Sequence, residues 1–143
     1  MRWRSYNRES APPAAAWMAM ALLALAGCHG NVQPAEGLDL LVATRVTRLT
    51  FAESDFKQAN GRYGALPEMI QFRPDLGADM VGDQYAGHRL VLSLTDAGFT
   101  LRADLVQPGP QSKFSFYSDQ LGFVRQSEGT APASASSPLL HTR

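Results

Sequence analysis

The chain has 143 residues, of which 45% are hydrophobic and 18% charged, a composition typical of one globular domain. Thirteen basic side chains balance thirteen acidic ones. Because binding to nucleic acid requires a basic face, this balance predicts no nucleic-acid partner.

Residues 1–27 have the three parts of a signal peptide. A basic, polar start at residues 1–10 precedes an apolar run at 14–26, which ends in Leu25-Ala26-Gly27-Cys28. The run is shorter than the roughly 20 apolar residues that span a bilayer. Small residues fit the narrow pocket of a signal peptidase, so we expect cleavage between Gly27 and Cys28.

The junction Leu25-Ala26-Gly27-Cys28 resembles the lipobox of bacterial lipoproteins. The resemblance implies that Cys28, the only cysteine, carries a diacylglycerol and that acyl chains such as palmitate hold the mature chain at the membrane. His29 stands where many Gram-negative lipoproteins of the inner membrane have Asp, which favours the periplasmic face of the outer membrane. The alternatives are an ordinary signal peptide with a free cysteine and an internal start.

A short tether, residues 28–36, is expected to lead into one domain at residues 37–126. Apolar residues recur there at steps of three and four, which predicts an amphipathic helix with one apolar face made of Leu38, Val42, Val46, Leu49, Ala52, Phe56, Ala59 and Tyr63. Asn60-Gly61 is expected to end this helix. Charged residues are expected on its solvated face, with a weak pair between Glu53 and Lys57, and these are Arg45, Arg48, Glu53 and Lys57.

The remainder of the domain predicts a short helical turn and two hairpins. The turn is expected at residues 66–70, where Pro67 fits the first helical position. Alternating apolar residues at 89–94 and 99–105 predict strands around the turn 95–98, in which Gly98 is expected to adopt positive φ. Residues 114–117 and 123–125 predict a second hairpin. The sequence therefore predicts an α+β fold, one long helix packed on a four-stranded antiparallel sheet, with residues 127–143 as a disordered, low-complexity tail.

Four strings in this order are similar to the globular part of type IV pilins and of the pilin-like proteins of type II secretion and related systems. They are Asn60 to Gly64, Leu66 to Glu68, Gly98-Phe99 and Ser115 to Arg125. The resemblance implies a pilin-like head and a structural or assembly role in envelope machinery, with a protein partner. Pilins begin with a long hydrophobic helix, whereas a lipobox and tether stand in its place here. This departure predicts a head that caps, pilots or contacts a machine without polymerising.

The sequence predicts no enzyme and no cofactor. No nucleophile motif surrounds any serine, and the three histidines lack the spacing of a metal site; His88 is expected at a strand edge. A glycine-containing loop carries Asp75, Asp79 and Asp83, for which loop capping is favoured over calcium binding. The alternative function is a lipoprotein that binds a small molecule or glycan through an aromatic surface formed by Tyr63, Tyr85, Phe114 and Tyr117.

Overall fold

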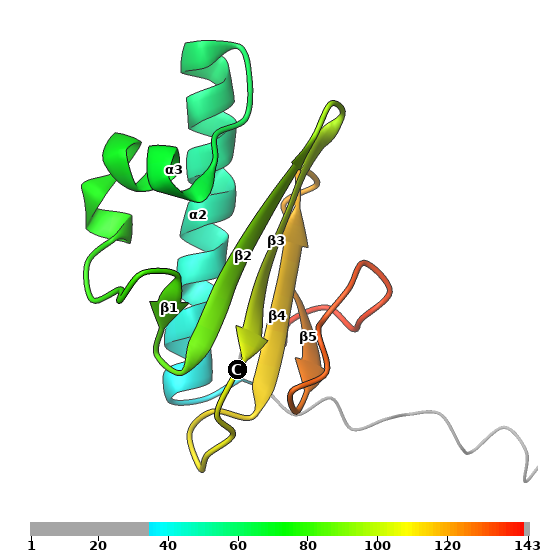
Figure 1. The fold of residues 1–143 in the computed structure, drawn as a ribbon. Coiled ribbons are helices and arrows are strands. Elements are labelled where there is room, and N and C mark those ends of the chain that lie inside the picture. The colour runs from blue at the N-terminus through cyan, green and yellow to red at the C-terminus, as the bar shows by residue number, and fades with distance from the viewer. Residues whose placement is uncertain (1–34, 142–143) are drawn as a thin grey trace, which may run out of the picture. The chain divides into compact units, whose positions relative to one another are not determined.

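The computed structural model describes residues 35–141, so the expected signal peptide and the lipidation site Cys28 lie outside the described residues. The described chain begins with helix α2 (Leu38–Asn60), helix α3 (Leu66–Phe72) and the 3-10 turn η2 (Pro74–Leu76). Strands follow in the order β1 (Gln84–Tyr85), β2 (His88–Thr95), β3 (Gly98–Leu105), β4 (Phe114–Asp119) and β5 (Arg125–Glu128). The predicted α+β class, with a long helix ahead of an antiparallel sheet, is confirmed (Figure 1).

The sheet has five strands in the order β1-β2-β3-β4-β5, so the expectation of four strands is wrong. Strand β1 has only two residues and pairs Gln84 with Arg89 of β2, a length too short for an alternating pattern to reveal. Both expected hairpins form, as β2 with β3 and β4 with β5. However, β5 begins at Arg125 and runs on to Glu128, past the expected domain boundary at residue 126.

Gly98 does not adopt the positive φ expected of it. It begins β3 directly opposite Thr95, and the two-residue turn between them closes the hairpin. A Cβ at this position would come within 2.5 Å of the Gln120 side chain. The Gln120 carboxamide therefore lies against Gly98, and a larger residue at this position would require that flexible side chain to move.

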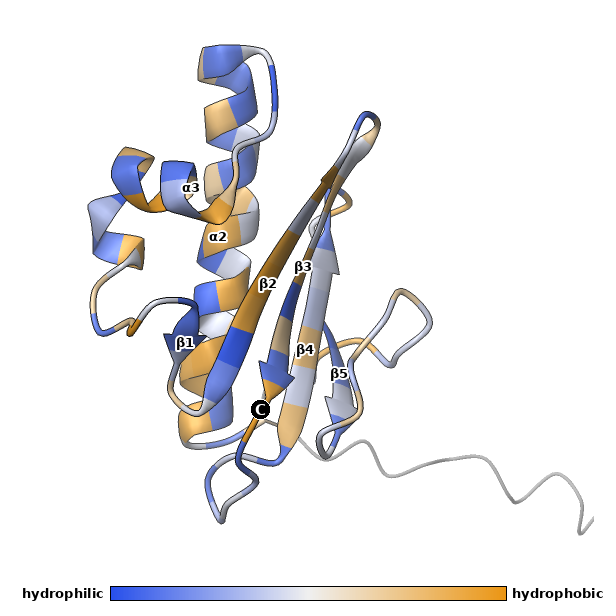
Figure 2. Ribbon diagram, viewed as in Figure 1, coloured by the Kyte–Doolittle hydropathy of each residue, from blue (hydrophilic) through white to orange (hydrophobic). Residues whose placement is uncertain are grey.

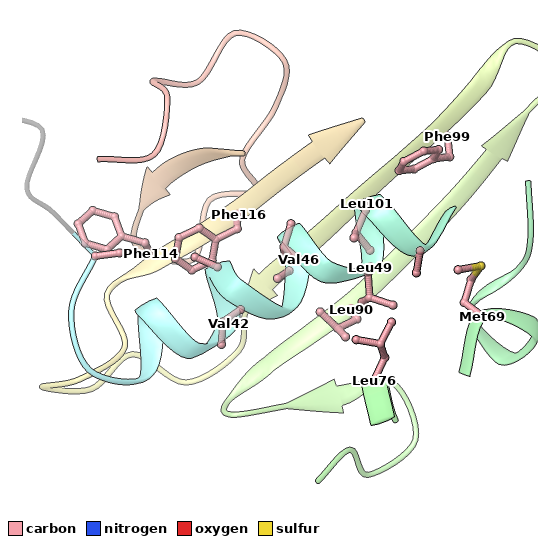
Figure 3. Packing of buried hydrophobic residues seen from close by; sticks show 14 of the residues in the cluster. Val42, Val46, Leu49, Met69, Leu76, Leu90, Phe99, Leu101, Phe114 and Phe116 are labelled. Carbon is pink, nitrogen blue, oxygen red and sulfur yellow. The ribbon is translucent and has the colours of Figure 1, made fainter. Parts of the chain in front are cut away.

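Helix α2 packs on one face of the sheet, over β3 and β4. Five residues of its predicted apolar face are buried: Val42, Val46, Leu49, Ala52 and Phe56. They meet side chains that alternate along the strands, among them Leu90, Leu101 and Phe116, as Figure 3 shows. The helix ends at Gly61, whose φ of 75° lies in the left-handed region and whose N–H donates to the Lys57 carbonyl, as predicted.

The segment after β5 is ordered against the sheet, which corrects the expectation of a disordered tail for residues 129–141. The Gln126 N–H donates to the Pro138 carbonyl and the Leu140 N–H donates to the Val124 carbonyl, each at 2.9 Å. Ala133 is buried. These backbone bonds, made by the segment from Pro138 to Leu140, cover the outer edge of β5.

Candidate interaction surface

Two charged residues of α2 that were expected in solvent are buried. Glu53 is 0% exposed and one of its carboxylate oxygens accepts the Gly64 N–H at 3.0 Å, so its expected pair with Lys57 does not form. Burial raises the pKa of the Glu53 carboxyl above its usual range, and the hydrogen bond from Gly64 offsets part of this effect. Glu53 therefore holds the chain after α2 against the helix.

Arg45 has a comparable role nearer the start of α2. Its guanidinium donates to the carbonyls of Leu76 and Ala78, the second at 3.2 Å, and lies 4.1 Å from the ring centroid of Tyr85. A guanidinium in contact with carbonyls and an aromatic face satisfies its donors without a carboxylate. Arg45 therefore connects α2 to η2 and β1, and it is not part of a solvated face.

His88 is also buried. The sequence predicts it at a strand edge, whereas both of its ring nitrogens contact backbone carbonyls inside the fold. Its Nδ1 lies 3.0 Å from the Ala86 carbonyl, its Nε2 lies 2.8 Å from the Phe114 carbonyl, and the ring is 0% exposed. The Asp39 carboxylate, which accepts the N–H groups of Lys113 and Phe114, lies 3.8 Å from the same Nε2. This group joins α2, β2 and β4, and its position in the core leaves it no access to a substrate.

The three loop aspartates do not gather around one point. Asp75 pairs with Arg73 at 3.2 Å, and Asp83 pairs with Arg89 at 3.6 Å. The hydrogen bond from Arg73 lowers the pKa of the Asp75 carboxyl. Within residues 35–141, no three His, Cys, Asp or Glu side chains are placed to hold a metal ion.

The four aromatic residues considered as a ligand surface are likewise separate. Tyr63 packs edge-on against Phe99, with ring centroids 5.1 Å apart, whereas Tyr85 lies under Arg45. Phe114 is in the core, and the Tyr117 hydroxyl donates to Asp119 on the opposite face of the sheet. Their positions fit packing within the fold.

The edge of β2 is the most conspicuous open feature of the described residues. Strand β1 covers β2 only at His88 and Arg89, and within residues 35–141 no strand pairs with the same side of β2 from Val91 to Thr95. The Leu90 N–H, which is on this side, donates to the Asp83 carbonyl at 2.8 Å. Because backbone groups of an antiparallel strand alternate in direction, Leu92 and Leu94 also direct their N–H and C=O groups to this open side.

The open stretch of β2 has the sequence Val91-Leu92-Ser93-Leu94-Thr95, without charge or proline. Leu94 is 43% exposed, and Figure 2 shows the hydrophobic colour along the middle of β2. Protein edges usually carry a charged residue, a proline, a bulge or a covering segment that prevents pairing with another chain. The opposite edge of the sheet, at β5, has such a cover, whereas β2 has none among the described residues.

One hollow lies at the end of this open edge, and a second lies between α3 and the loop before β1. One, of about 390 Å³, is lined by Lys57, Arg62 and Tyr63 on one side and by Leu94, Thr95 and Asp96 on the other. A second, of about 500 Å³, is lined mainly by apolar residues of α3 and by the loop before β1, and its residues are Leu66, Pro67, Ile70, Gly82 and Asp83. The first hollow, beside the open strand, offers a place for a side chain of an added strand.

Of the two basic side chains that line the first hollow, one forms an ion pair and the other does not within residues 35–141. Arg62 forms an ion pair with Glu68 at 2.6 Å, and the hydrogen bond from Arg62 lowers the pKa of Glu68 to about 2. The Lys57 ammonium instead lies 3.3 Å from the Tyr63 hydroxyl, and no ion pair among residues 35–141 includes it. Lys57 can therefore meet an incoming carboxylate at the end of the open edge.

Sequence reasoning predicted the β2–β3 hairpin but did not recognise β2 as an open edge. The lack of charge and proline between Arg89 and Asp96 is the signal that could have indicated it. No helix within residues 35–141 has both the length and the apolar character needed to cross a membrane. Comparison of the chain with protein-family models, curated proteins and solved structures finds no match.

Proposed function

We propose that the mature chain is a lipid-anchored, non-enzymatic binding module of the bacterial cell envelope, with a pilin-like head. In this proposal the head contacts a secretion or pilus machine by adding an extended segment of a partner protein to the open edge of β2. The observation that carries the binding role is the uncharged edge from Val91 to Thr95, whose outward backbone groups have no partner strand in residues 35–141.

The anchor in this proposal rests on the sequence. A basic start, a short apolar run and the junction Leu25 to Cys28 together make a consistent lipoprotein signal. Several acyl chains on one cysteine each add about 0.8 kcal/mol per buried methylene, which is enough for stable membrane attachment. Attachment to the outer membrane is favoured by His29, which stands where many Gram-negative lipoproteins of the inner membrane have Asp.

The pilin-like part of the proposal is supported by the order of the secondary-structure elements and by contacts of the residues in the similar strings. A long helix before an antiparallel sheet is the arrangement that the four similar strings imply. The Asn60 to Gly64 string has a physical reason in this chain, because Gly61 ends α2 and Gly64 donates to the buried Glu53. A Cβ at Gly64 would lie 3.0 Å from the Phe56 ring, so the second glycine also allows close packing.

The residues around the open edge of β2 indicate which kind of partner segment would fit there. Leu92 and Leu94 each present one N–H and one C=O, so the partner must supply backbone in extended conformation. Apolar side chains suit the exposed Leu94, and a carboxylate suits the position beside Lys57. We therefore expect an extended segment with alternating apolar residues and one acidic residue near its end.

Photocrosslinking from an unnatural residue at Thr95, in cells that make the lipidated protein, tests the binding role. Leu94→Pro removes a donor that points away from β3, and edge strands tolerate proline at such positions, so the hairpin can persist while the added strand loses a hydrogen bond. We expect this variant to reduce one defined crosslinked product roughly tenfold, since a lost backbone bond and its desolvation cost together exceed about 1.4 kcal/mol.

A matched pair of charged variants provides the control. Leu94→Lys and Leu121→Lys both replace an exposed leucine, because the two side chains are 43% and 70% exposed. The product should fall only in Leu94→Lys. No product at Thr95, or equal products in the two lysine variants, would reject binding at this edge.

The anchor is tested separately, by mass spectrometry of Cys28 in the membrane fraction. Its acylated N-terminal peptide is the expected finding. If Cys28→Ser were still cleaved after Gly27 and still membrane-bound, the lipoprotein assignment would be wrong, whatever the crosslinking experiment gave.

A further inference from the structure

The end of the head that is nearest to Cys28 along the chain is made of three segments. They are the start of α2, the turn between β1 and β2, and the loop between β3 and β4, which Figure 1 shows at one end of the head. Backbone bonds hold them together: the Asp39 N–H donates to the Gln111 carbonyl at 3.2 Å, and the Val106 N–H donates to the Gly87 carbonyl at 3.0 Å. The turn between β2 and β3 is at the opposite end.

A hollow of about 490 Å³ lies among these three segments, and none of the residues that line it is charged. Leu38 comes from α2, Ala86 comes from the β1–β2 turn, and Pro108 and Pro110 come from the β3–β4 loop. Val106, at the start of the same loop, is 45% exposed. In a domain whose outer sheet face carries Arg102, Asp104 and Asp119, this hollow is distinguished by its uncharged lining. The end of the head that holds it is called the uncharged end below, although two charged residues flank the hollow in sequence.

Chain length limits how far this end can be from Cys28. Six residues separate Cys28 from Ala35, and an extended chain spans at most about 3.6 Å per residue, or about 25 Å over the seven steps. If Cys28 carries lipid, the uncharged end therefore stays within about 25 Å of the bilayer surface. Charged side chains next to the hollow in sequence, Glu36 and Lys113, have opposite signs and give no net repulsion from anionic lipid.

We propose that this uncharged end of the head rests on the bilayer surface, with the hollow between Leu38 and the Pro108–Pro110 loop facing lipid. The inference rests on the proposed lipid anchor at Cys28. Contact of apolar and proline side chains with the interface is favoured because it removes apolar surface from water, and the tether keeps the two surfaces close. In this orientation the turn between β2 and β3 points away from the membrane. The open half of β2, which leads into that turn, points away from the membrane as well.

The sequence makes a direct test possible. Both tryptophans, Trp3 and Trp17, are in the expected signal peptide, so the mature chain has none, and Cys28 is its only cysteine. The mature protein can be coupled through the Cys28 thiol to a maleimide phospholipid in vesicles of phosphatidylethanolamine and phosphatidylglycerol. Coupling in this way supplies the anchor whether or not cells lipidate Cys28, so failure of the orientation is distinguishable from failure of the anchor.

Single tryptophans then report the distance from lipid. Val106→Trp is in the uncharged end, and Leu121→Trp is the matched control, because Leu121 is also an exposed apolar residue and follows Asp119 at the opposite end of the sheet. Brominated acyl chains should quench Val106→Trp several-fold more strongly than Leu121→Trp. Pro108→Trp serves as a second reporter at the uncharged end. Equal quenching at the two ends, or quenching of neither Val106→Trp nor Pro108→Trp, would overturn the inference.

Discussion

The Asp39 carboxylate lies 3.8 Å from Nε2 of His88, and both side chains are buried where α2, β2 and β4 meet. The two ring nitrogens of His88 each lie within 3.0 Å of a carbonyl oxygen. The His88 ring therefore bridges the turn before β2 and strand β4, beside a carboxylate that accepts two backbone N–H groups.

The first prediction follows from this pair. His88→Ala should lower the free energy of unfolding by about 2–5 kcal/mol, because it leaves buried carbonyl groups without their partner and opens a cavity in the core. His141→Ala is the control: this side chain is exposed, so a change within about 0.5 kcal/mol is expected. Denaturant unfolding that gave similar losses of stability for the two variants would contradict this role of His88.

The second prediction concerns Glu53 and pH. Burial raises its pKa above 4.5 in the folded state, so the unfolded chain loses this proton more readily than the folded protein. The contribution of Glu53 to stability is therefore complete below pH 4.5 and is lost as pH rises through the folded pKa. Glu53→Gln keeps an oxygen for the Gly64 N–H but does not titrate, so its stability relative to the native protein should increase from pH 4.5 towards neutral.

Thermal unfolding of the native protein and Glu53→Gln across this pH range measures the effect. Asp39 also has a pKa raised by burial, but it is present in both proteins and cancels in their difference. Asp96→Asn, at the exposed β2–β3 turn, is the control for loss of one negative charge. A difference between Glu53→Gln and the native protein that did not vary with pH would show that Glu53 is not buried as a titrating group.

The third prediction compares the stability effects of truncating a buried and an exposed phenylalanine of α2. Phe56 packs at a right angle against Phe72, with ring centroids 5.4 Å apart, whereas Phe51 is 63% exposed on the same helix. Phe56→Ala should cost roughly 3–5 kcal/mol, and Phe51→Ala should change stability by no more than about 0.5 kcal/mol. Denaturant unfolding of the two variants makes the comparison. Similar losses in both would mean that the buried side of α2 is wrongly assigned.

Periodicity predicted the long elements because their patterns extend over many residues. The steps of three and four in α2 and the alternation in β2 and β3 specify which side chains share a face. The same patterns do not reveal what covers each face. Glu53 and Arg45 are buried because residues far along the chain, Gly64 and Leu76, lie over them. Neither contact could be predicted from local spacing.

The remaining differences also arise from contacts between distant segments. Strand β1 consists of two residues and exists only because β2 pairs with it. Residues 127–143 are predicted as a tail from their low-complexity composition, yet the segment 138–140 within them has backbone partners in β5 and at Val124. The open edge of β2 is likewise a property of the sheet order, which the hairpin sequences alone leave undetermined. Composition therefore underestimated the extent of the fold at its C-terminal end.

The fourth prediction tests this C-terminal cover. Deletion of residues 131–143 removes the bonds to Pro138 and Leu140 and opens the edge of β5. The truncated protein should be less stable and should self-associate, because a second uncovered edge becomes available for pairing. Light scattering against the full mature chain measures the association. A truncated protein that stayed monomeric with unchanged stability would indicate that the segment does not cover β5 in solution.

Amide hydrogen exchange at the open edge of β2 tests the central claim most directly. In the purified lipidated protein, the amides of Leu92 and Leu94 point outward and should exchange quickly, whereas that of Ser93, which faces β3, should exchange slowly. In native membranes containing the partner, exchange at Leu92 and Leu94 should slow while exchange at Ser93 stays unchanged. Exchange at Leu92 and Leu94 that is equally fast in native membranes, or already slow in the purified protein, would contradict strand addition at this edge.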